Sequence, residues 1–229
     1  MAGSAVIAIS GLTKTFEHTT VLTGIDLSIA RGESIAIVGS DADGCRTLMR
    51  ILATLVAPTS GRVVIDGLDV VTDLYRVRRL VAYADAGRVP PNRLRVVEYL
   101  RLVAGARRQP PSAAIDAANL VGLDADASIE TLTDDLRQRL PLAAALAAAA
   151  NLVLLDDTFR ALDAPARDRV FSWLVAARER GTTVIAAAND PGVVEVCQRT
   201  VVLHAGRVAT LPVSEALDRS APAKELVGA

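Results

Sequence analysis

Residues 39–48 read Gly-Ser-Asp-Ala-Asp-Gly-Cys-Arg-Thr-Leu, and this stretch decides the fold. An apolar segment, Ser34 to Val38, precedes it, and residues 47–52 continue it with an apolar pattern. Gly39, four residues and Gly44, placed between a buried strand and a helix, have the spacing of a phosphate-binding loop. In such a loop, backbone N–H groups surround the phosphates. The sequence therefore predicts an α/β fold in which residues 34–38 form a strand and residues 47–52 a helix.

The same loop lacks the side chains that bind phosphate and metal. The pattern requires Lys and then Ser or Thr after the second glycine, whereas this chain has Cys45 and Arg46. Asp41 and Asp43 add negative charge, and two like charges about 4 Å apart repel by about 4 kcal/mol at an effective dielectric of about 20. We therefore expect ATP to bind weakly at this loop, if at all. In an alternative register, shifted by one residue, Arg46 and Thr47 act as the Lys and Thr.

Further segments stand in the order and spacing of one protein family. They are Val21 to Ile29, Arg31 to Glu33, Pro58 to Gly67, Arg137 to Leu140, Leu152 to Asp157, Ala161 to Asp163 and His204 to Val208. With these segments the chain resembles the ATP-binding subunit of ABC transporters over nearly all of its 229 residues. Residues 69–79 and 96–100 look most like subunits that serve export-type (ABC-2) permeases.

The resemblance implies a P-loop NTPase fold of the ABC type. We expect a mostly parallel core sheet, an N-terminal antiparallel β portion and a helical subdomain at about residues 88–150. Strands of β-branched residues that alternate with helices agree with a parallel core. Helical patterns run from Val96 to Val103 and from Ser112 to Val121. Residues 1–229 are predicted to form one ABC ATPase-like domain, with a C-terminal tail at about 211–229.

The resemblance also assigns a role to each position of the nucleotide site. Phe16 fits the aromatic residue on which the family stacks adenine, although ordinary core packing explains it equally well. Asp156 matches the carboxylate that orders Mg²⁺, and Asp157 stands in place of the catalytic Glu. Because its side chain is one methylene shorter, Asp157 is expected to be a weak general base. Two acids at the end of a buried strand are an alternative reading, since such ends line a crevice in any case. The nucleotide-binding positions are Phe16, Gly39, Gly44, Cys45, Arg46 and Thr47.

Other functional positions of the family are altered in this chain. The Gln that contacts metal and water corresponds to Ala86, and the switch His corresponds to Asn189, while Asp163 keeps the D-loop acid. The signature Leu-Ser-Gly-Gly-Gln becomes Leu132, Thr133, Asp134, Asp135 and Leu136. In the family this helix N-terminus faces the γ-phosphate of ATP held by the opposite subunit, so Asp134 and Asp135 oppose that anion. The same acids stabilise a first helical turn after Thr133 as N-cap.

A retained frame with altered chemistry predicts a pseudo-ATPase. The predicted chain docks on a transmembrane permease through about residues 85–105 and pairs with a second ABC ATPase subunit. ATP and Mg²⁺ are the cofactors that the resemblance implies, although this loop is not expected to hold them well. Two alternatives stay open: a working ATPase subunit that powers export, and a regulatory or binding module outside transport. Whether the chain is an enzyme is therefore open at this stage.

Composition restricts the partners and the location. The chain is 51% hydrophobic and 22% charged, with a net charge of −1, which argues against a nucleic-acid partner. Cys45 and Cys197 lie far apart in sequence, so no disulfide framework is expected. The apolar run from Leu140 to Leu155 is shorter than the roughly 20 residues that a span requires. No export signal is recognised at the N-terminus. We therefore expect a cytoplasmic protein, held at the membrane through its permease.

Overall fold

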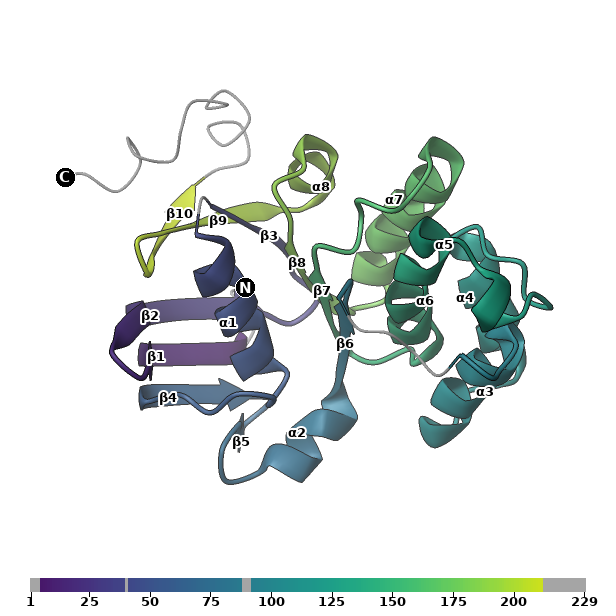
Figure 1. The fold of residues 1–229 in the computed structure, drawn as a ribbon. Helices are drawn as coiled ribbons and strands as arrows, with labels where there is room; N and C mark the ends of the chain where they lie inside the picture. Colours follow the sequence, from purple (N-terminus) through teal and green to yellow (C-terminus); the bar gives the residue numbers. More distant parts are fainter. Residues whose placement is uncertain (1–4, 40, 88–91, 212–229) are drawn as a thin grey trace.

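The computed structural model describes residues 5–39, 41–87 and 92–211, which form two β-sheets and the helices around them (Figure 1). The strands are β1 (Ala5–Phe16), β2 (Thr19–Ala30), β3 (Ser34–Val38), β4 (Ser60–Ile65), β5 (Leu68–Asp69), β6 (Val81–Asp85), β7 (Leu152–Asp156), β8 (Thr183–Ala187), β9 (Arg199–His204) and β10 (Arg207–Leu211). The helices are α1 (Ala42–Leu52), α2 (Leu74–Leu80), α3 (Val96–Ala106), α4 (Ser112–Leu120), the 3₁₀ helix η1 (Ile129–Thr131), α5 (Asp134–Gln138), α6 (Leu140–Ala147), α7 (Ala164–Glu179) and α8 (Pro191–Val196).

The first sheet has the strand order β2-β1-β4-β5, and its neighbours run antiparallel. Buried side chains such as Ile7, Ile9, Leu27 and Ile29 point to one face, because successive residues of a strand face opposite sides. This sheet confirms the predicted N-terminal antiparallel portion.

The second sheet has the order β10-β9-β3-β8-β7-β6. The five strands from β9 to β6 pair in parallel, and β10 adds an antiparallel edge. In β7 and β8 every residue is buried, as expected for parallel strands covered on both faces. The predicted, mostly parallel core sheet is confirmed.

Helices cover both faces of the second sheet (Figure 1). On one side, α1 lies between the two sheets and buries Leu48, Met49, Ile51 and Leu52 in the core that they share. On the other side, α3, α4, α6 and α7 share a second core with the sheet. Helix α6 is buried over all eight of its residues, which explains why its sequence is apolar all round.

Helices α3 and α4 are present where the sequence predicted them, with bounds that differ by a few residues. Together with α5 and α6 they gather at the right of Figure 1, within the range expected for the helical subdomain. Of the predicted coupling segment 85–105, residues 88–91 lie outside the described residues, as do residues 212–229 of the predicted tail. No helix among the described residues combines the length and the apolar content that a membrane span requires.

The predicted start of the helix after the glycine-rich loop is wrong. Helix α1 begins at Ala42, five residues before the expected Thr47. The reason is Asp41, which has the non-helical backbone of an N-cap and whose side chain accepts a hydrogen bond from the N–H of Gly44. Most of the segment expected to wrap a phosphate is therefore the first turn of a helix.

Candidate functional site

Several of the predicted site residues meet at the carboxyl ends of β3, β7 and β8, where open α/β sheets bind ligands. A cleft of about 470 Å³ lies there. Its lining includes Gly39, Cys45, Arg46, Asp156, Asp157, Arg160, Asn189 and Asp190.

A second cleft, also of about 470 Å³, adjoins the first and shares Arg46, Asp156 and Asp157 with it. It brings Ala86 and Asp134 to the same region, because α5 faces the ends of β6 and β7. The positions matched to the loop, the metal carboxylate, the Gln and the signature are thus neighbours in space.

Asp41 occupies the anion position at the N-terminus of α1. Its Oδ1 accepts a hydrogen bond from the N–H of Gly44 at 2.8 Å, and its Oδ2 accepts one from the N–H of Gly206 at 3.2 Å. Its backbone carbonyl accepts from the N–H of Cys45 at 3.0 Å. A helix N-terminus attracts anions because its first N–H groups are unpaired and its dipole is positive there. The Asp41 carboxylate therefore places a negative charge at this helix end and takes up one of its N–H groups.

The two glycines of the loop have a packing role. A Cβ atom at Gly39 would lie 1.9 Å from the carbonyl oxygen of Leu203 in β9, and one at Gly44 would lie 2.7 Å from the Leu203 side chain. The Asn189 side chain also holds Gly39, accepting from its N–H at 3.0 Å and donating to its carbonyl at 2.8 Å. Close packing against β9 therefore requires these glycines without any phosphate, and the Asn189 amide is engaged with the loop.

Cys45 and Arg46 stand in place of the Lys and the hydroxyl of the loop pattern. Cys45 is only 9% exposed, and burial, followed by the charges of Asp41 and Asp156, raises the pKa of its thiol to about 12. It is a neutral core residue. The half-exposed Arg46 side chain instead turns toward the metal position, with its Nε 3.9 Å from Oδ2 of Asp156. Thr47 is buried in α1.

Asp156 is a buried carboxylate held by a tyrosine. The hydroxyl of Tyr83 donates to Oδ2 of Asp156 at 2.9 Å, across the neighbouring strands β6 and β7. Burial raises the pKa of Asp156, which the Tyr83 hydrogen bond partly opposes. Burial and the charge of Asp156 also raise the pKa of the Tyr83 phenol, so it remains a neutral donor. The Mg²⁺-type carboxylate is thus already bound by a phenol and approached by a guanidinium.

The remaining catalytic positions offer little chemistry. Asp157 has a left-handed backbone, with φ of 52°, and its carboxylate lies 3.4 Å from Arg160. Ala86 lines the second cleft and has no polar side-chain atom to contribute. Phe16 is 43% exposed at the end of β1, and Lys14 covers its ring at 4.6 Å.

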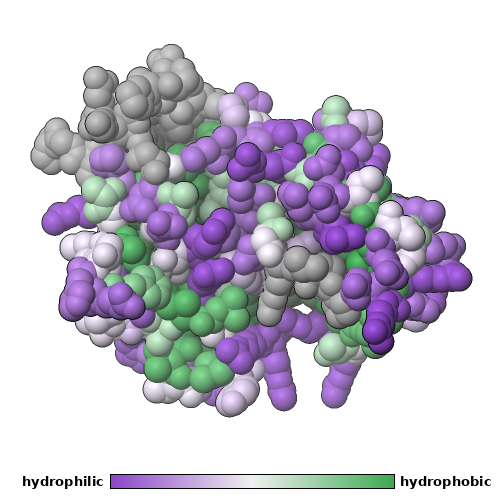
Figure 2. Space-filling view, viewed as in Figure 1, coloured by the Kyte–Doolittle hydropathy of each residue, from purple (hydrophilic) through white to green (hydrophobic). Residues whose placement is uncertain are grey.

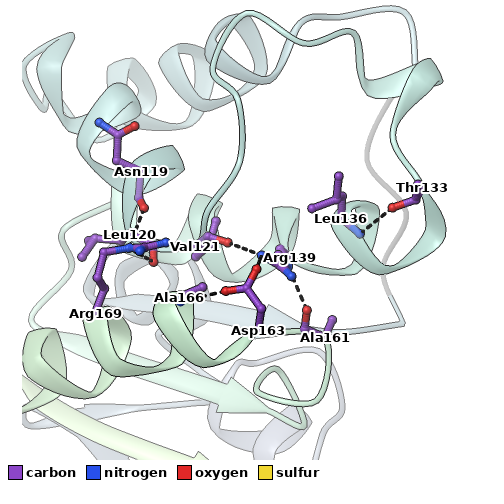
Figure 3. A network of polar contacts seen from close by, with 10 residues as sticks. All are labelled: Asn119, Leu120, Val121, Thr133, Leu136, Arg139, Ala161, Asp163, Ala166 and Arg169. Carbon is purple, nitrogen blue, oxygen red and sulfur yellow. Dashed lines mark hydrogen bonds and ion pairs between the residues drawn. The ribbon is translucent and has the colours of Figure 1, made fainter.

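Figure 3 shows the hydrogen bonds of the signature and D-loop positions, which form two separate sets. Thr133 caps α5 by accepting from the N–H of Leu136 at 3.4 Å, and Asp134 and Asp135 are exposed in its first turn, as predicted. Asp163 caps α7 by accepting from Ala166 at 2.9 Å. Leu132 is buried below them.

Arg139, which follows α5, bonds to the D-loop segment through its side chain. It is 6% exposed and donates to Asp163 and to the carbonyls of Val121 and Ala161, all within 3.0 Å (Figure 3). The hydrogen bond from Ala166 and then the one from Arg139 lower the pKa of Asp163. Asp163 therefore has a structural role in this fold.

Sequence reasoning missed two residues of the site. Asp41 was taken as an acid in a loop, although an Asp three residues before Gly44 at a helix start has the pattern of an N-cap. Tyr83 carried no signal in the sequence, since its contact with Asp156 depends on which strands are neighbours.

A mostly parallel sheet with a glycine-containing loop between β3 and α1 defines the class of P-loop NTPase folds. A family model described as "ABC transporter" matches residues 22–160, more than half of the chain. The chain therefore belongs to the ABC transporter family, as an ATP-binding subunit.

Relatives and solved structures agree with this assignment. The chain is 32% identical to the aliphatic sulfonates import ATP-binding protein SsuB 1 of Nocardia farcinica, over 89% of this chain and 80% of that protein. It is 35% identical to the sulfate/thiosulfate import protein CysA of Methylococcus capsulatus, over 88% of this chain and 61% of the relative. Identity to the macrolide export protein MacB of Brucella abortus is 31%, over 91% of this chain and 34% of the relative. These relatives are named as import and as export proteins. The similarity to subunits of export-type permeases therefore remains a prediction.

The fold matches the ATP-binding cassette MJ0796, solved as a dimer in a post-hydrolysis state bound to ADP and Pi. The TM-score is 0.81 at 24% identity, over 90% of this chain and 98% of that one. This likeness confirms the fold class.

Proposed function

We propose that this chain is a noncatalytic, ATP-binding-type subunit of an ABC membrane transporter, with little or no ATP hydrolysis of its own. The observation that carries the proposal is the Asp41 carboxylate. It accepts hydrogen bonds from the N–H groups of Gly44 and Gly206, at the helix N-terminus where the loop pattern would bind a phosphate. Cys45 supplies no cation, and Arg46 brings its own positive charge toward Asp156. In this proposal, the Asp41 carboxylate repels and replaces a phosphate of ATP, and the Arg46 guanidinium repels and replaces Mg²⁺ beside Asp156.

The proposed partners are a permease and a second ABC ATPase subunit, which hold the chain at the cytoplasmic face of the membrane. A groove of about 330 Å³ supports permease docking, because its lining includes Asp85 and Gly87 of the predicted coupling surface. The side chain of Leu55, which also lines the groove, is 46% exposed. Arg50, Val56 and Tyr83 complete its lining. The dimer of the MJ0796 cassette, which shares this fold, supports pairing with a second subunit.

The first test is Mg-ATP binding and hydrolysis by the purified chain, alone and in its copurified complex. Fluorescent-nucleotide titration measures binding, and phosphate release measures turnover. The proposal expects no binding by this chain at millimolar ATP, and activity of the complex that depends only on the partner's loop. Tight binding, or turnover that Asp156→Asn abolishes, would replace the proposal with the alternative of a working ATPase.

Repair of the loop tests the structural reason. Cys45→Lys with Arg46→Thr and Asp43→Gly is expected to raise nucleotide affinity, and the addition of Asp41→Gly is expected to raise it further. The difference between the two variants isolates the internal carboxylate. Hydrolysis is expected to stay low in both, because the Gln, His and signature positions are still altered. Vigorous hydrolysis after this repair would contradict the claim that those positions are disabling.

Docking is tested on the groove. Leu55→Asp replaces an exposed apolar side chain of the groove with a charge and is expected to reduce copurification of the permease. Val175→Asp on α7 is the matched control, since Val175 is 37% exposed and does not line the groove. Equal recovery of the permease with both variants would argue against this groove.

A further inference from the structure

Positive charge is concentrated in one part of the chain. The described residues between 74 and 108 include eight arginines and no lysine, against two acids, Asp85 and Glu98. The whole chain has a net charge of −1, so the remainder is acidic. Both acids are engaged within the fold: Asp85 lies 3.6 Å from Arg50, and Glu98 accepts from the N–H of Arg95 at 2.8 Å.

Seven of these eight arginines are exposed. The side chains of Arg79, Arg101 and Arg108, like that of Arg93, form no hydrogen bond or ion pair with the other residues that the structure describes. Arg76 and Arg78 differ in this respect, since Arg76 pairs with Asp73 at 3.2 Å and Arg78 donates to Thr54 at 2.8 Å. The guanidinium groups of Arg79, Arg101 and Arg108 are therefore available to an outside anion.

Arg107 connects the ends of the two helices in or next to which these arginines lie. Its guanidinium donates to the backbone carbonyl of Arg79 at 2.7 Å and to that of Val81 at 2.6 Å, so the end of α3 is fastened to the end of α2. Arg108 follows Arg107 directly in the chain, and Arg101 lies in α3, five residues before its end at Ala106.

The backbone of Arg108 gives an independent reason to look for a role of its side chain. Its φ is 56°, and the chain turns there to end α3, with its N–H donating to Gly105 and that of Gln109 to Ala104, both at 2.9 Å. Glycine is the usual residue at this position because it adopts the left-handed conformation without strain. A long cationic side chain stands there instead, without a partner among the described residues.

Large apolar side chains stand near these arginines. Tyr75 in α2 is 77% exposed, Leu102 in α3 is 64% exposed, and Val71 just before α2 is 47% exposed. Figure 2 shows an apolar patch at the lower left, over the region of β5 and α2 in Figure 1, and hydrophilic side chains that project from the lower edge beside it. Arginines that surround exposed aromatic and aliphatic residues match a bilayer surface, where cations meet headgroups and apolar groups enter the interface.

We propose that the arginine face, formed by Arg79, Arg101 and Arg108 with Tyr75 and Leu102, binds the headgroups of anionic phospholipids. The inference rests on the proposed function, which places the chain next to a membrane-embedded permease. The competing occupant is the permease, because Arg101 and Leu102 fall within the predicted coupling segment 85–105. It is the less favoured one, because the groove that supports permease docking is lined by Arg50 and not by these three arginines. Projecting side chains suit the flat surface of a bilayer.

The test is cosedimentation of the purified chain, without permease or nucleotide, with two kinds of vesicles. One kind is phosphatidylcholine alone, and the other is phosphatidylcholine mixed with phosphatidylglycerol. Binding is expected only to the mixed vesicles at low salt, with loss at about 1 M salt, where the screening length falls to about 3 Å. Equal binding to both kinds of vesicles, or binding to neither, would overturn the proposal.

Variants locate the binding face. Arg79→Gln with Arg108→Gly is expected to weaken binding to the mixed vesicles roughly thirty-fold, since each arginine near an anionic surface contributes about a factor of five. Arg180→Gln with Arg207→Gln removes the same charge from exposed positions elsewhere and is expected to change little. Arg108→Gly alone separates binding from folding, because thermal stability should rise while vesicle binding falls. If the Arg79→Gln, Arg108→Gly variant and the Arg180→Gln, Arg207→Gln control lost vesicle binding equally, the assignment to the arginine face would be refuted.

The vesicle result is distinguishable from failure of the proposed function, which nucleotide titration and permease copurification measure separately. Suppose that the Arg79→Gln, Arg108→Gly variant no longer copurifies with the permease and that the wild-type chain does not bind anionic vesicles. The arginine face then binds an acidic protein segment, and the lipid proposal is wrong.

Discussion

Replacing Asp41 with alanine is expected to lower stability without creating a nucleotide site by itself. The substitution removes an N-cap, which contributes about 1 kcal/mol. It also removes the hydrogen bond to Gly206, typically another 1 kcal/mol or so. A loss of about 2 kcal/mol corresponds to a fall in Tm of about 4 to 8 °C for a chain of this size. Thermal and urea unfolding followed by circular dichroism measure it.

Two matched variants test the reasoning. Asp43→Ala removes a carboxylate from the same helical turn, where Asp43 is exposed and interacts mainly with the helix dipole, so a loss below about 1 kcal/mol is expected. Asp41→Asn keeps a side-chain oxygen for Gly44 and is expected to keep most of the stability. If Asp41→Ala were no less stable than Asp43→Ala, the carboxylate would not be the internal ligand of α1, and the main argument for a closed loop would fail.

Three further predictions concern closely packed or buried positions. Because the folded pKa of Asp156 is raised, Asp156→Asn should stabilise the fold at neutral pH, and unfolding titrations should show this advantage shrinking as pH falls through the raised pKa toward the ordinary 3.8. Gly39→Ala should cost several kcal/mol, measured by urea unfolding, since its Cβ would overlap the carbonyl of Leu203; tolerance would disprove the close approach. Arg139→Met should cost about 2 kcal/mol or more because it leaves the carbonyls of Val121 and Ala161 without their donor, whereas Arg160→Met at an exposed position should cost under about 1 kcal/mol in the same assay.

The fold was largely predictable because its signals are local. Apolar runs such as Leu152 to Leu155 identify buried parallel strands, and the loop from Gly39 to Gly44 marks the turn from strand to helix. The start of α1 was misjudged because the glycine spacing implied a loop, while capping by Asp41 extended the helix toward β3. The N-cap at Asp41, and not the glycine spacing, therefore determined where α1 begins.

The site was predictable as a set of positions. From the order of the motifs along the chain, the sequence predicted that Asp156, Asn189 and the loop lie near one another. In the structure they line one cleft at the ends of β3, β7 and β8. The identity of each contact was not predictable. The sequence shows that Arg46 stands in a hydroxyl position, but its approach to Asp156 depends on how α1 lies on the sheet.

The sequence by itself determined the family and the alternation of strands and helices, and it predicted the loss of the Lys, Gln and His positions, because these properties belong to single residues or to short-range periodicity. Only the tertiary structure decided what replaced the lost chemistry. Asp41 meets Gly206 across 165 positions of chain, and Tyr83 meets Asp156 across 73. Such contacts arise when packing brings distant strands and turns together, and a local pattern of residues contains no information about that distance.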